Sequence, residues 1–511
     1  MNLVWQQLML STLPIRQWLS ASYLHYLVGP LRQWRKGSRL MQWADWIGGA
    51  LVMLVFAISP FVKNELIAVL LAACGIYWVL LTVSDEGDKD WGLGIRDQGL
   101  GIGESGGEEI EEATPIELSP TPHTPHPTPP APRVSRLAPL TTPIHLLVLL
   151  YWAIATVATA MSPVKKEAFV GWQKLTLYLL FFALMARVLR HARIRAWTIT
   201  SYLLAALAVS VYGLQQWFSG AAALATWVDP ESPLSKTTRV YSYLGNPNLL
   251  AAYLVPAVVF SVVACFAWKR WMCKALAVVM VVVNVSCLIL TFSRGGWIGM
   301  VAGLMVLLLL LAHWWSIHLP RFWRTWALPI VFGTAAAVII LAVVVVEPLR
   351  DRVSSIFAGR GDSSNNFRIN VWMAVIEMIK DRPLLGIGPG NTAFNKIYPL
   401  YQRPRFSALS AYSILLEVAV ETGLIGLTCF IWLLLTTLTQ AWRALQGLRQ
   451  LGDREGYWLI GAIAAMAGLF SHGMFDTVLY RPEVNILWWL TFALIASYYR
   501  EPAAEVEKVE R

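Results

Sequence analysis

The sequence predicts an all-α membrane protein: a polytopic transmembrane helical bundle of about 12 spans, with a large extracytoplasmic loop that contains short helices. Of its 511 residues, 57% are apolar and only 14% are charged, whereas soluble domains carry about 25% charged residues. Apolar runs of roughly twenty residues, the length that crosses a bilayer, recur along the chain. One polar segment, at 347–411, is much longer than an ordinary connection between two spans.

The composition excludes several classes of protein. The formal net charge of +10 could indicate nucleic acid, but Lys and Arg flank the apolar runs, where they orient membrane helices. No basic, aromatic-interleaved soluble domain is present, so we expect no nucleic-acid partner. The five Cys lie in or beside apolar runs without CxxC spacing, which indicates neither a disulfide framework nor a metal site. No motif for a nucleotide or other cofactor is visible.

The N-terminal part has two spans between polar segments. Residues 1–42 alternate Trp and Tyr with Arg and Lys, which predicts a cytoplasmic, interfacial amphipathic segment. The first two transmembrane helices follow at 43–83, divided into 43–62 and 64–83. Residues 84–142 are acidic and then Pro-rich, and we expect a disordered cytoplasmic linker there. A docking site for a protein partner is the alternative interpretation of this linker.

Ten further spans are predicted, in a bundle over 143–346 and a C-terminal group over 412–499, before a cytoplasmic tail at 500–511. Compact basic loops, such as RVLRHARIR at 187–195, fall on the same side as the N-terminus if all spans are real. The positive-inside rule then places both termini in the cytoplasm. We expect the chain to lie in the inner (plasma) membrane of the cell. The ten ranges are 143–163, 169–188, 196–218, 248–268, 272–291, 295–313, 326–346, 413–436, 457–476 and 484–499.

The large periplasmic or lumenal loop at 347–411 is basic, with nine Lys and Arg against five acidic residues. Long loops are translocated regardless of charge, so the topology stands, and an anion-handling role would explain the excess. Residues 366–380 have helical spacing. This helix either presents Arg368 to a cavity or lies at the interface with a snorkelling Arg. Arg403 and Arg405 are further anion-binding candidates.

The helix is followed by a glycine turn, Gly386-Ile-Gly388-Pro-Gly390. It is not a dinucleotide-binding loop, because no strand precedes it and no βαβ unit exists. We expect its glycines to let the backbone approach the bilayer surface.

Several ionisable residues lie near the outer ends of predicted spans. Arg294, in SRGGW, is held near the outer boundary by very short connections, and such a group is a functional candidate. Snorkelling to outer headgroups is its alternative role. His472 and Asp476 have i, i+4 helical spacing, which favours a structural polar cluster over a two-ligand metal site.

Two polar pairs flank other spans. Asn246 and Asn248 open a span and could cap its helix or contact a polar ligand. Glu417 and Glu421 lie one helical turn apart on the span after the large loop. Buried acids in a span need a partner, and the loop arginines are the obvious ones.

These motifs resemble the O-antigen ligase and polymerase superfamily of membrane glycan-transfer proteins. The resemblance covers about residues 285–435 and is carried by SRGGWIG, Arg368…Trp372…RPLLGIGPG and ETGLIGL. It implies that Arg294 and Arg368 contact the pyrophosphate of a lipid-linked glycan, a task suited to guanidinium groups. The sequence departs from the family at Tyr412, where ligases carry a His thought to act as a general base; Tyr, with a pKa of about 10, is a poor one.

A narrower resemblance, carried by YLGNPNLLAAYL and HGMFDTVLYRPEVNILWW, is to the cyanobacterial inorganic-carbon accumulation family, often labelled putative bicarbonate transporters. It implies a role in bicarbonate accumulation, with membrane lipids and a small anion such as bicarbonate as partners. The alternative function is a glycan ligase or polymerase acting on a lipid-pyrophosphate-linked saccharide. A third hypothesis is a non-catalytic scaffold that recruits partners through 84–142.

Overall fold

The computed structural model is a bundle of α-helices, with no strand in the part of the chain that it describes. The segments predicted at 1–42 and 500–511, the linker and the first part of the large loop lie outside or almost entirely outside that part. The described residues are 43–84, 142–220, 239–318, 320–345, 363–477 and 479–499, together with Ser38, Arg350, Ser354 and Gly359.

A helix occupies each of the twelve ranges predicted as spans. Nine helices within the described residues are long and apolar enough to cross a membrane, judged by length and composition. The all-α, multi-pass fold is therefore confirmed, while the count of twelve spans stays a prediction. The helices are α6 (Ala44–Ile58), α7 (Asn64–Val83), α8 (Pro143–Ala160), α9 (Lys165–Val188), α10 (Ala192–Ser219), α11 (Pro247–Ala267), α12 (Trp271–Leu290), α13 (Arg294–Trp315), α14 (Arg321–Val345), α18 (Ile414–Leu451), α19 (Glu455–Gly473) and α20 (Pro482–Ser497).

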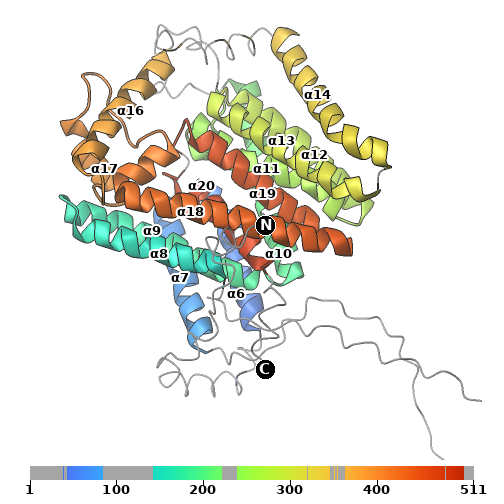
Figure 1. The fold of residues 1–511 in the computed structure, drawn as a ribbon, viewed down its shortest axis with the longest axis horizontal. Helices are drawn as coiled ribbons and strands as arrows, with labels where there is room; N and C mark the ends of the chain where they lie inside the picture. The colour runs from blue at the N-terminus through green and yellow to red at the C-terminus, as the bar shows by residue number, and fades with distance from the viewer. Residues whose placement is uncertain are drawn as a thin grey trace, which may run out of the picture.

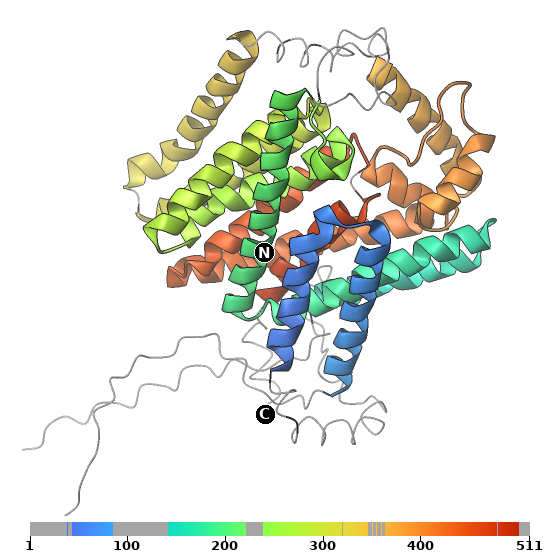
Figure 2. The ribbon, with the colours of Figure 1, turned by 180° about the vertical axis from the view of Figure 1, so that it is seen from behind.

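The centre of the bundle is α11, which is apolar on all sides and buried along most of its length, as expected for a helix surrounded by others. It packs against α13 and α19 (Figures 1 and 2). Small residues bring these helices together, because a Cβ placed on Gly299 would lie 2.7 Å from the carbonyl oxygen of Gly468. Such close approach is the usual packing mode of helices in a membrane.

Ion pairs fix the relative sidedness of the helix ends. Arg187, at the end of α9, pairs with Asp45 at 3.3 Å. Arg195 pairs with Glu455 and stacks on Tyr498, 4.1 Å from the ring centroid. Both arginines are almost fully buried, so this part of the basic RVLRHARIR motif ties helices together in addition to setting charge bias. The start of α6, the turn after α9, the start of α19 and the end of α20 therefore share one side.

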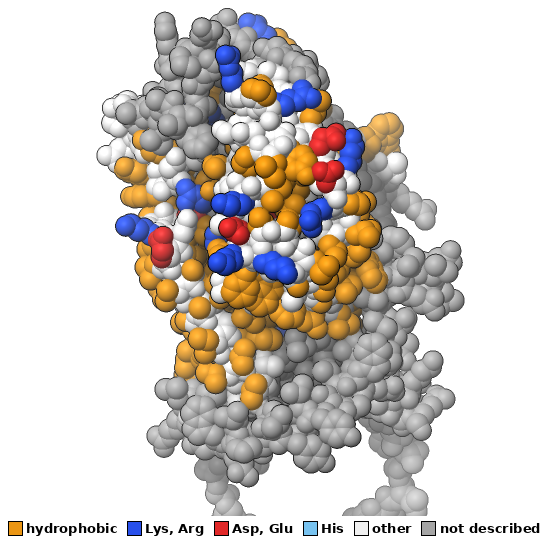
Figure 3. All heavy atoms as spheres, turned by 90° about the vertical axis from the view of Figure 1, so that its left-hand side faces the viewer, with side chains coloured by type: hydrophobic (Ala, Val, Ile, Leu, Met, Phe, Trp, Pro, Cys, Tyr) orange, Lys and Arg blue, Asp and Glu red, His pale blue; other side chains and the backbone are white. Residues whose placement is uncertain are grey.

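The opposite side carries the described part of the large loop. The predicted helix at 366–380 is α16 (Ser363–Asp381), followed by α17 (Asn391–Ile397), and both cover one end of the bundle (Figure 1). The predicted apolar face of α16 is buried at Val371, Val375 and Met378. Figure 3 views the molecule from the side on which α16 and α17 lie. It shows Lys and Arg side chains on the surface there, with a band of hydrophobic side chains below them.

The long helix α18 is broken where the loop joins it. Gly423 has φ 69° and ψ −175°, so the helix stops and restarts there. The carbonyl groups that lose helical partners are bonded by the glycine turn: the amide of Ile387 donates to Val420 and that of Gly388 to Glu421, both at 2.9 Å. Non-helical backbone within a membrane protein is tolerated where protein buries it in this way.

The expectation that the glycine turn lies on the bilayer surface is wrong. Residues 386–389 are buried against α18 and α9. A Cβ on Gly171 of α9 would lie 1.8 Å from the carbonyl oxygen of Pro389, and one on Gly390 would lie 2.5 Å from the Cα of Gly171. The glycines allow contact between backbones, which hydropathy alone does not reveal.

We expect Gly171→Ala to destabilise the protein by about 1–3 kcal/mol, because the new methyl group meets backbone atoms that cannot rotate away. The measurement is the thermal unfolding midpoint of the purified protein in detergent. Gly447→Ala is the matched control: it is also helical, and its added Cβ meets no atom within 4 Å. A midpoint lowered equally by both substitutions would contradict this account.

Candidate functional site

A cavity of about 230 Å³ opens between the start of α13, the face of α16 that carries Arg368 and the turn after α19. Two guanidinium groups and several apolar side chains line it. The lining consists of Arg294, Gly295, Ile298, Gly359, Asn365, Arg368, Ile369, Trp372 and Phe475.

Arg294 is placed by the cap of α13. The hydroxyl of Ser293 accepts a hydrogen bond from the amide of Gly296 at 3.2 Å, so Ser293 is the N-cap and the helix starts at Arg294. Only 9% of Arg294 is exposed, so the side chain faces the cavity rather than extending to outer headgroups. The next residue, Gly295, leaves room for the imidazole of His472, whose Cδ2 would lie 2.8 Å from a Cβ at this position.

Arg368 is held from three directions. Its Nε donates to the carbonyl oxygen of Phe475 at 2.6 Å and its Nη1 donates to the hydroxyl of Ser364. Its Nη2 pairs with Asp476 at 3.3 Å, and both side chains are largely buried. A guanidinium fixed in this way keeps a defined orientation, which is a requirement for binding a planar or tetrahedral oxyanion.

His472 and Asp476 thus form part of a polar cluster. Within the described residues, no group of three His, Cys, Asp or Glu side chains could hold a metal ion. The Nδ1 atom of His472 is buried and has no hydrogen-bond partner there. Asp476 also accepts a hydrogen bond from the amide of Thr477 at 2.8 Å.

A third arginine, which the sequence interpretation missed, stands beside the cavity. Arg239 donates from Nε to the carbonyl oxygen of Thr291 at 2.9 Å and from Nη2 to Asn248 at 3.1 Å. Burial lowers the pKa of Arg239; the Asp476 charge raises it, whereas the charges of Arg368 and Arg294 lower it further. The available signal was its position directly before the YSYLGNPN motif.

The two asparagines of that motif have different roles. The side chain of Asn246 caps α11 and accepts from the amide of Asn248 at 2.8 Å. The side chain of Asn248 holds Arg239, so it acts on the arginine group rather than directly on the cavity. Among the described residues, three arginines and one carboxylate therefore meet at this site, which leaves an excess of positive charge.

Two other loop arginines lie elsewhere. Arg403 and Arg405 are exposed and do not line the cavity. Arg403 donates to the side chain of Asn370 at 3.2 Å on the other face of α16. The candidates predicted together are thus divided between the cavity and the outer surface.

Tyr412 closes the site on the side of α18. Its ring meets Phe367 edge-on at 5.2 Å, and its carbonyl oxygen accepts from the indole of Trp372 at 3.3 Å. Burial raises the pKa of Tyr412, and the Asp476 charge raises it further. Its hydroxyl is therefore protonated at neutral pH and can donate a hydrogen bond but not act as a base.

The expected pairing of Glu417 and Glu421 with loop arginines is not found among the described residues. The carboxylate of Glu421 accepts instead from the amide of Gly390 at 2.8 Å, so it anchors the glycine turn. Glu417 is buried, and its Oε2 has no hydrogen-bond partner. Glu421 therefore has a backbone amide as its partner instead of a guanidinium group, because the glycine turn fills the break in α18.

The fold and the site define a multi-pass α-helical membrane protein with an arginine-lined cavity at one end. Residues 279–431 match the model of a protein family described as O-antigen ligase. This range contains Arg294, Arg368, Tyr412 and Gly423. The chain therefore has an O-antigen ligase-like region, and no curated protein matches it.

If the cavity binds an oxyanion such as inorganic pyrophosphate, Arg239→Gln should weaken that binding, because one of three positive charges near the cavity is lost. The expected change is on the order of tenfold, the effect of one charge-assisted hydrogen bond. The measurement is the rise in thermal unfolding midpoint on adding pyrophosphate. Arg193→Gln, an exposed arginine on the opposite side of the bundle, is the charge-matched control. An undiminished rise in Arg239→Gln would show that Arg239 takes no part.

Proposed function

We propose that the protein binds the pyrophosphate or phosphate group of a lipid-linked substrate in the outer cavity. The observation that carries this proposal is the gathering of Arg239, Arg294 and Arg368 near the carboxylate of Asp476. Like charges held together in a partly buried site repel one another unless an anion joins them. A pyrophosphate carries several negative charges and many acceptor oxygens, which suits more than one guanidinium group.

The walls of the cavity support a lipid-linked substrate. Ile298, Ile369, Trp372 and Phe475 add an apolar lining beside the arginines. A lipid-linked phosphate has a charged group that can bind the arginines and an apolar part that can contact the apolar walls. A small free anion makes no such apolar contact. The match of this region to O-antigen ligases agrees with a substrate of this class.

The packing beneath the cavity supports a site that faces outward. A Cβ on Gly468 of α19 would lie 2.9 Å from the carbonyl oxygen of Gly299 in α13. Backbones this close leave no path for a hydrated ion between these two helices in this conformation. Binding from the outer side needs no such path.

The proposal concerns binding, and Tyr412 limits the chemistry that could follow. Its buried hydroxyl stays protonated at neutral pH. It can orient an acceptor by donating a hydrogen bond, but it cannot remove the acceptor's proton as a His could. Glycan transfer would need a different base.

Bicarbonate accumulation is the second candidate function. Tyr412 at the position of the ligase His favours it, because a binding or transport protein needs no base there. The same arginines would then hold a carbonate-type oxyanion, and the chain would act in the inner membrane with its termini in the cytoplasm. A protein partner bound through 84–142 remains a separate proposal, on residues that lie largely outside the described part.

We expect Arg368→Gln to lower the affinity for a polyprenyl pyrophosphate by tenfold or more, on the order of one lost charge-assisted pair. The measurement uses purified protein in lipid nanodiscs. Arg405→Gln, exposed in the same loop and outside the cavity, is the control. In parallel, the flux of radiolabelled bicarbonate is measured in proteoliposomes that contain the same proteins. Two results together would favour bicarbonate accumulation over binding of a lipid-linked substrate. The protein would carry bicarbonate flux that Arg368→Gln abolishes, and it would not bind polyprenyl pyrophosphate.

We also expect the arginine site to lie outside the cytoplasm. Lys380 is exposed on α16, so Lys380→Cys should react with a membrane-impermeant maleimide in intact cells. Arg193→Cys, on the side of the buried ion pairs, should react only after permeabilisation. The parent protein corrects for its five native Cys. The reverse pattern of labelling would overturn the proposed topology and, with it, both candidate functions.

A further inference from the structure

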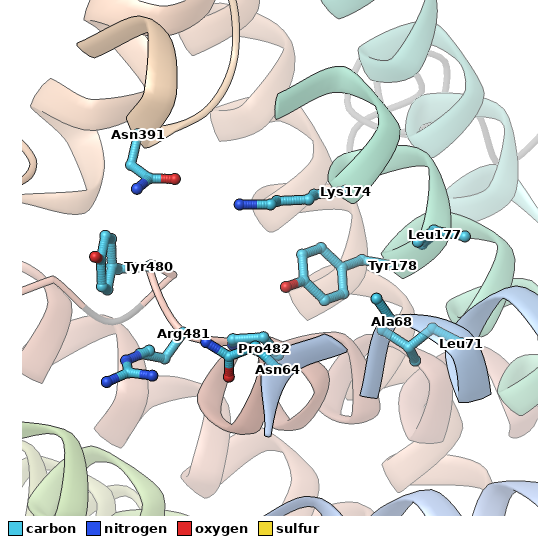
Figure 4. Close-up of a pocket in the computed structure, with 10 residues that line it drawn as sticks. All are labelled: Asn64, Ala68, Leu71, Lys174, Leu177, Tyr178, Asn391, Tyr480, Arg481 and Pro482. Atoms are coloured by element: carbon cyan, nitrogen blue, oxygen red, sulfur yellow. The ribbon is translucent and has the colours of Figure 1, made fainter. Parts of the chain in front are cut away.

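A second cavity, of about 130 Å³, lies on the same side of the bundle between α7, α9, α17 and the residues that lead into α20. Figure 4 shows the ammonium group of Lys174 and the hydroxyl of Tyr178 directed into this space, with the amide of Asn391 facing them. It is separate from the arginine cavity and shares no lining residue with it.

Lys174 is an unusual residue for its position. It lies well inside α9, within the range predicted as a span, where ionisable side chains are rare and often functional, and it is exposed at the edge of the cavity. No acidic side chain belongs to the described lining of the cavity. Arg481 also lines it, although its guanidinium extends away from Lys174 (Figure 4).

The backbone adds to the positive potential. The first residues of two membrane helices, Asn64 of α7 and Pro482 of α20, line the cavity. Neither helix start has a side-chain cap. Acidic residues do stand in both first turns. Glu65 is exposed, and Glu483 is outside the lining but is buried close enough to Tyr178 to act on it electrostatically. At α7 the first amides and the positive end of the helix dipole favour an anion at such a place. At α20 only the dipole contributes, because Pro482 has no amide hydrogen and the amide of Glu483 bonds the carboxylate of the same residue.

We propose that this cavity is an oxyanion site that holds a single phosphate group. Lys174 supplies the countercharge, and Tyr178 and Asn391 donate hydrogen bonds. The volume suits one such group with a few water molecules, not a sugar chain. The phosphate belongs either to a phospholipid headgroup or to free phosphate, and the experiment separates the two sources.

The site adjoins the arginine cavity through Tyr480. Tyr480 lines the second cavity and lies near Tyr412, which stands beside the first. The outer face would therefore hold two oxyanions side by side. The second site does not depend on what the arginine cavity binds.

The test measures inorganic phosphate binding by calorimetry in an Arg368→Gln background, which weakens the first site. Lys174→Gln should lower the remaining affinity on the order of tenfold. Lys174→Arg should restore most of it, because the positive charge returns. Lys166→Gln, exposed on the same helix and outside the cavity, should have no effect. Asn391→Asp, which places a carboxylate in the cavity, should weaken binding as well.

The second arm counts phosphatidylglycerol molecules retained by the same variants in native mass spectrometry. Loss in this arm alone identifies a lipid headgroup, and loss in the calorimetric arm alone identifies free phosphate. If Lys174→Gln does not fold, Asn391→Asp decides. Unchanged binding in both arms for the folded variants overturns the proposal, whatever Arg368→Gln does by itself.

Discussion

The break in α18 at Gly423 is the constraint on which the outer half of the molecule depends. It frees the carbonyl groups of Val420 and Glu421 in a region where water is scarce, and unpaired backbone groups there cost several kcal/mol. The amides of Ile387 and Gly388 satisfy them. The large loop is therefore joined to the bundle by backbone hydrogen bonds, and α16, which precedes this turn, is held over the start of α13.

That attachment is what brings the arginines together. Arg294 comes from α13, Arg368 from α16 and Arg239 from the segment before α11. Arg239 and Arg368 donate hydrogen bonds to the backbone of other elements. Arg294 is almost fully buried. Holding three positive charges around Asp476 costs stability in the absence of an anion. Such concentrations of like charge are typical of sites selected for binding rather than for folding.

The sequence predicted part of this site and missed part of it. Arg294 and Arg368 could be found because each stands in a motif next to an apolar run. Arg239 gave a weaker signal, since nothing local shows that it reaches Thr291 and Asn248. Lys174 was not singled out from the sequence, because most of the residues that line the second cavity with it come from α7, α17 and the segment before α20. Contacts between residues so distant in the chain leave no local pattern.

The sequence by itself determined the helices, because the hydropathy of each run and the polar faces of α16 depend only on neighbouring residues. It also determined where basic residues gather along the chain. Only the tertiary structure decided that the glycine turn fills the break in α18 instead of lying on the bilayer, and that Glu421 binds the amide of Gly390 instead of an arginine. The physical reason is that backbone groups are identical at every residue, so their pairing is set by the packing of whole helices and not by side-chain type.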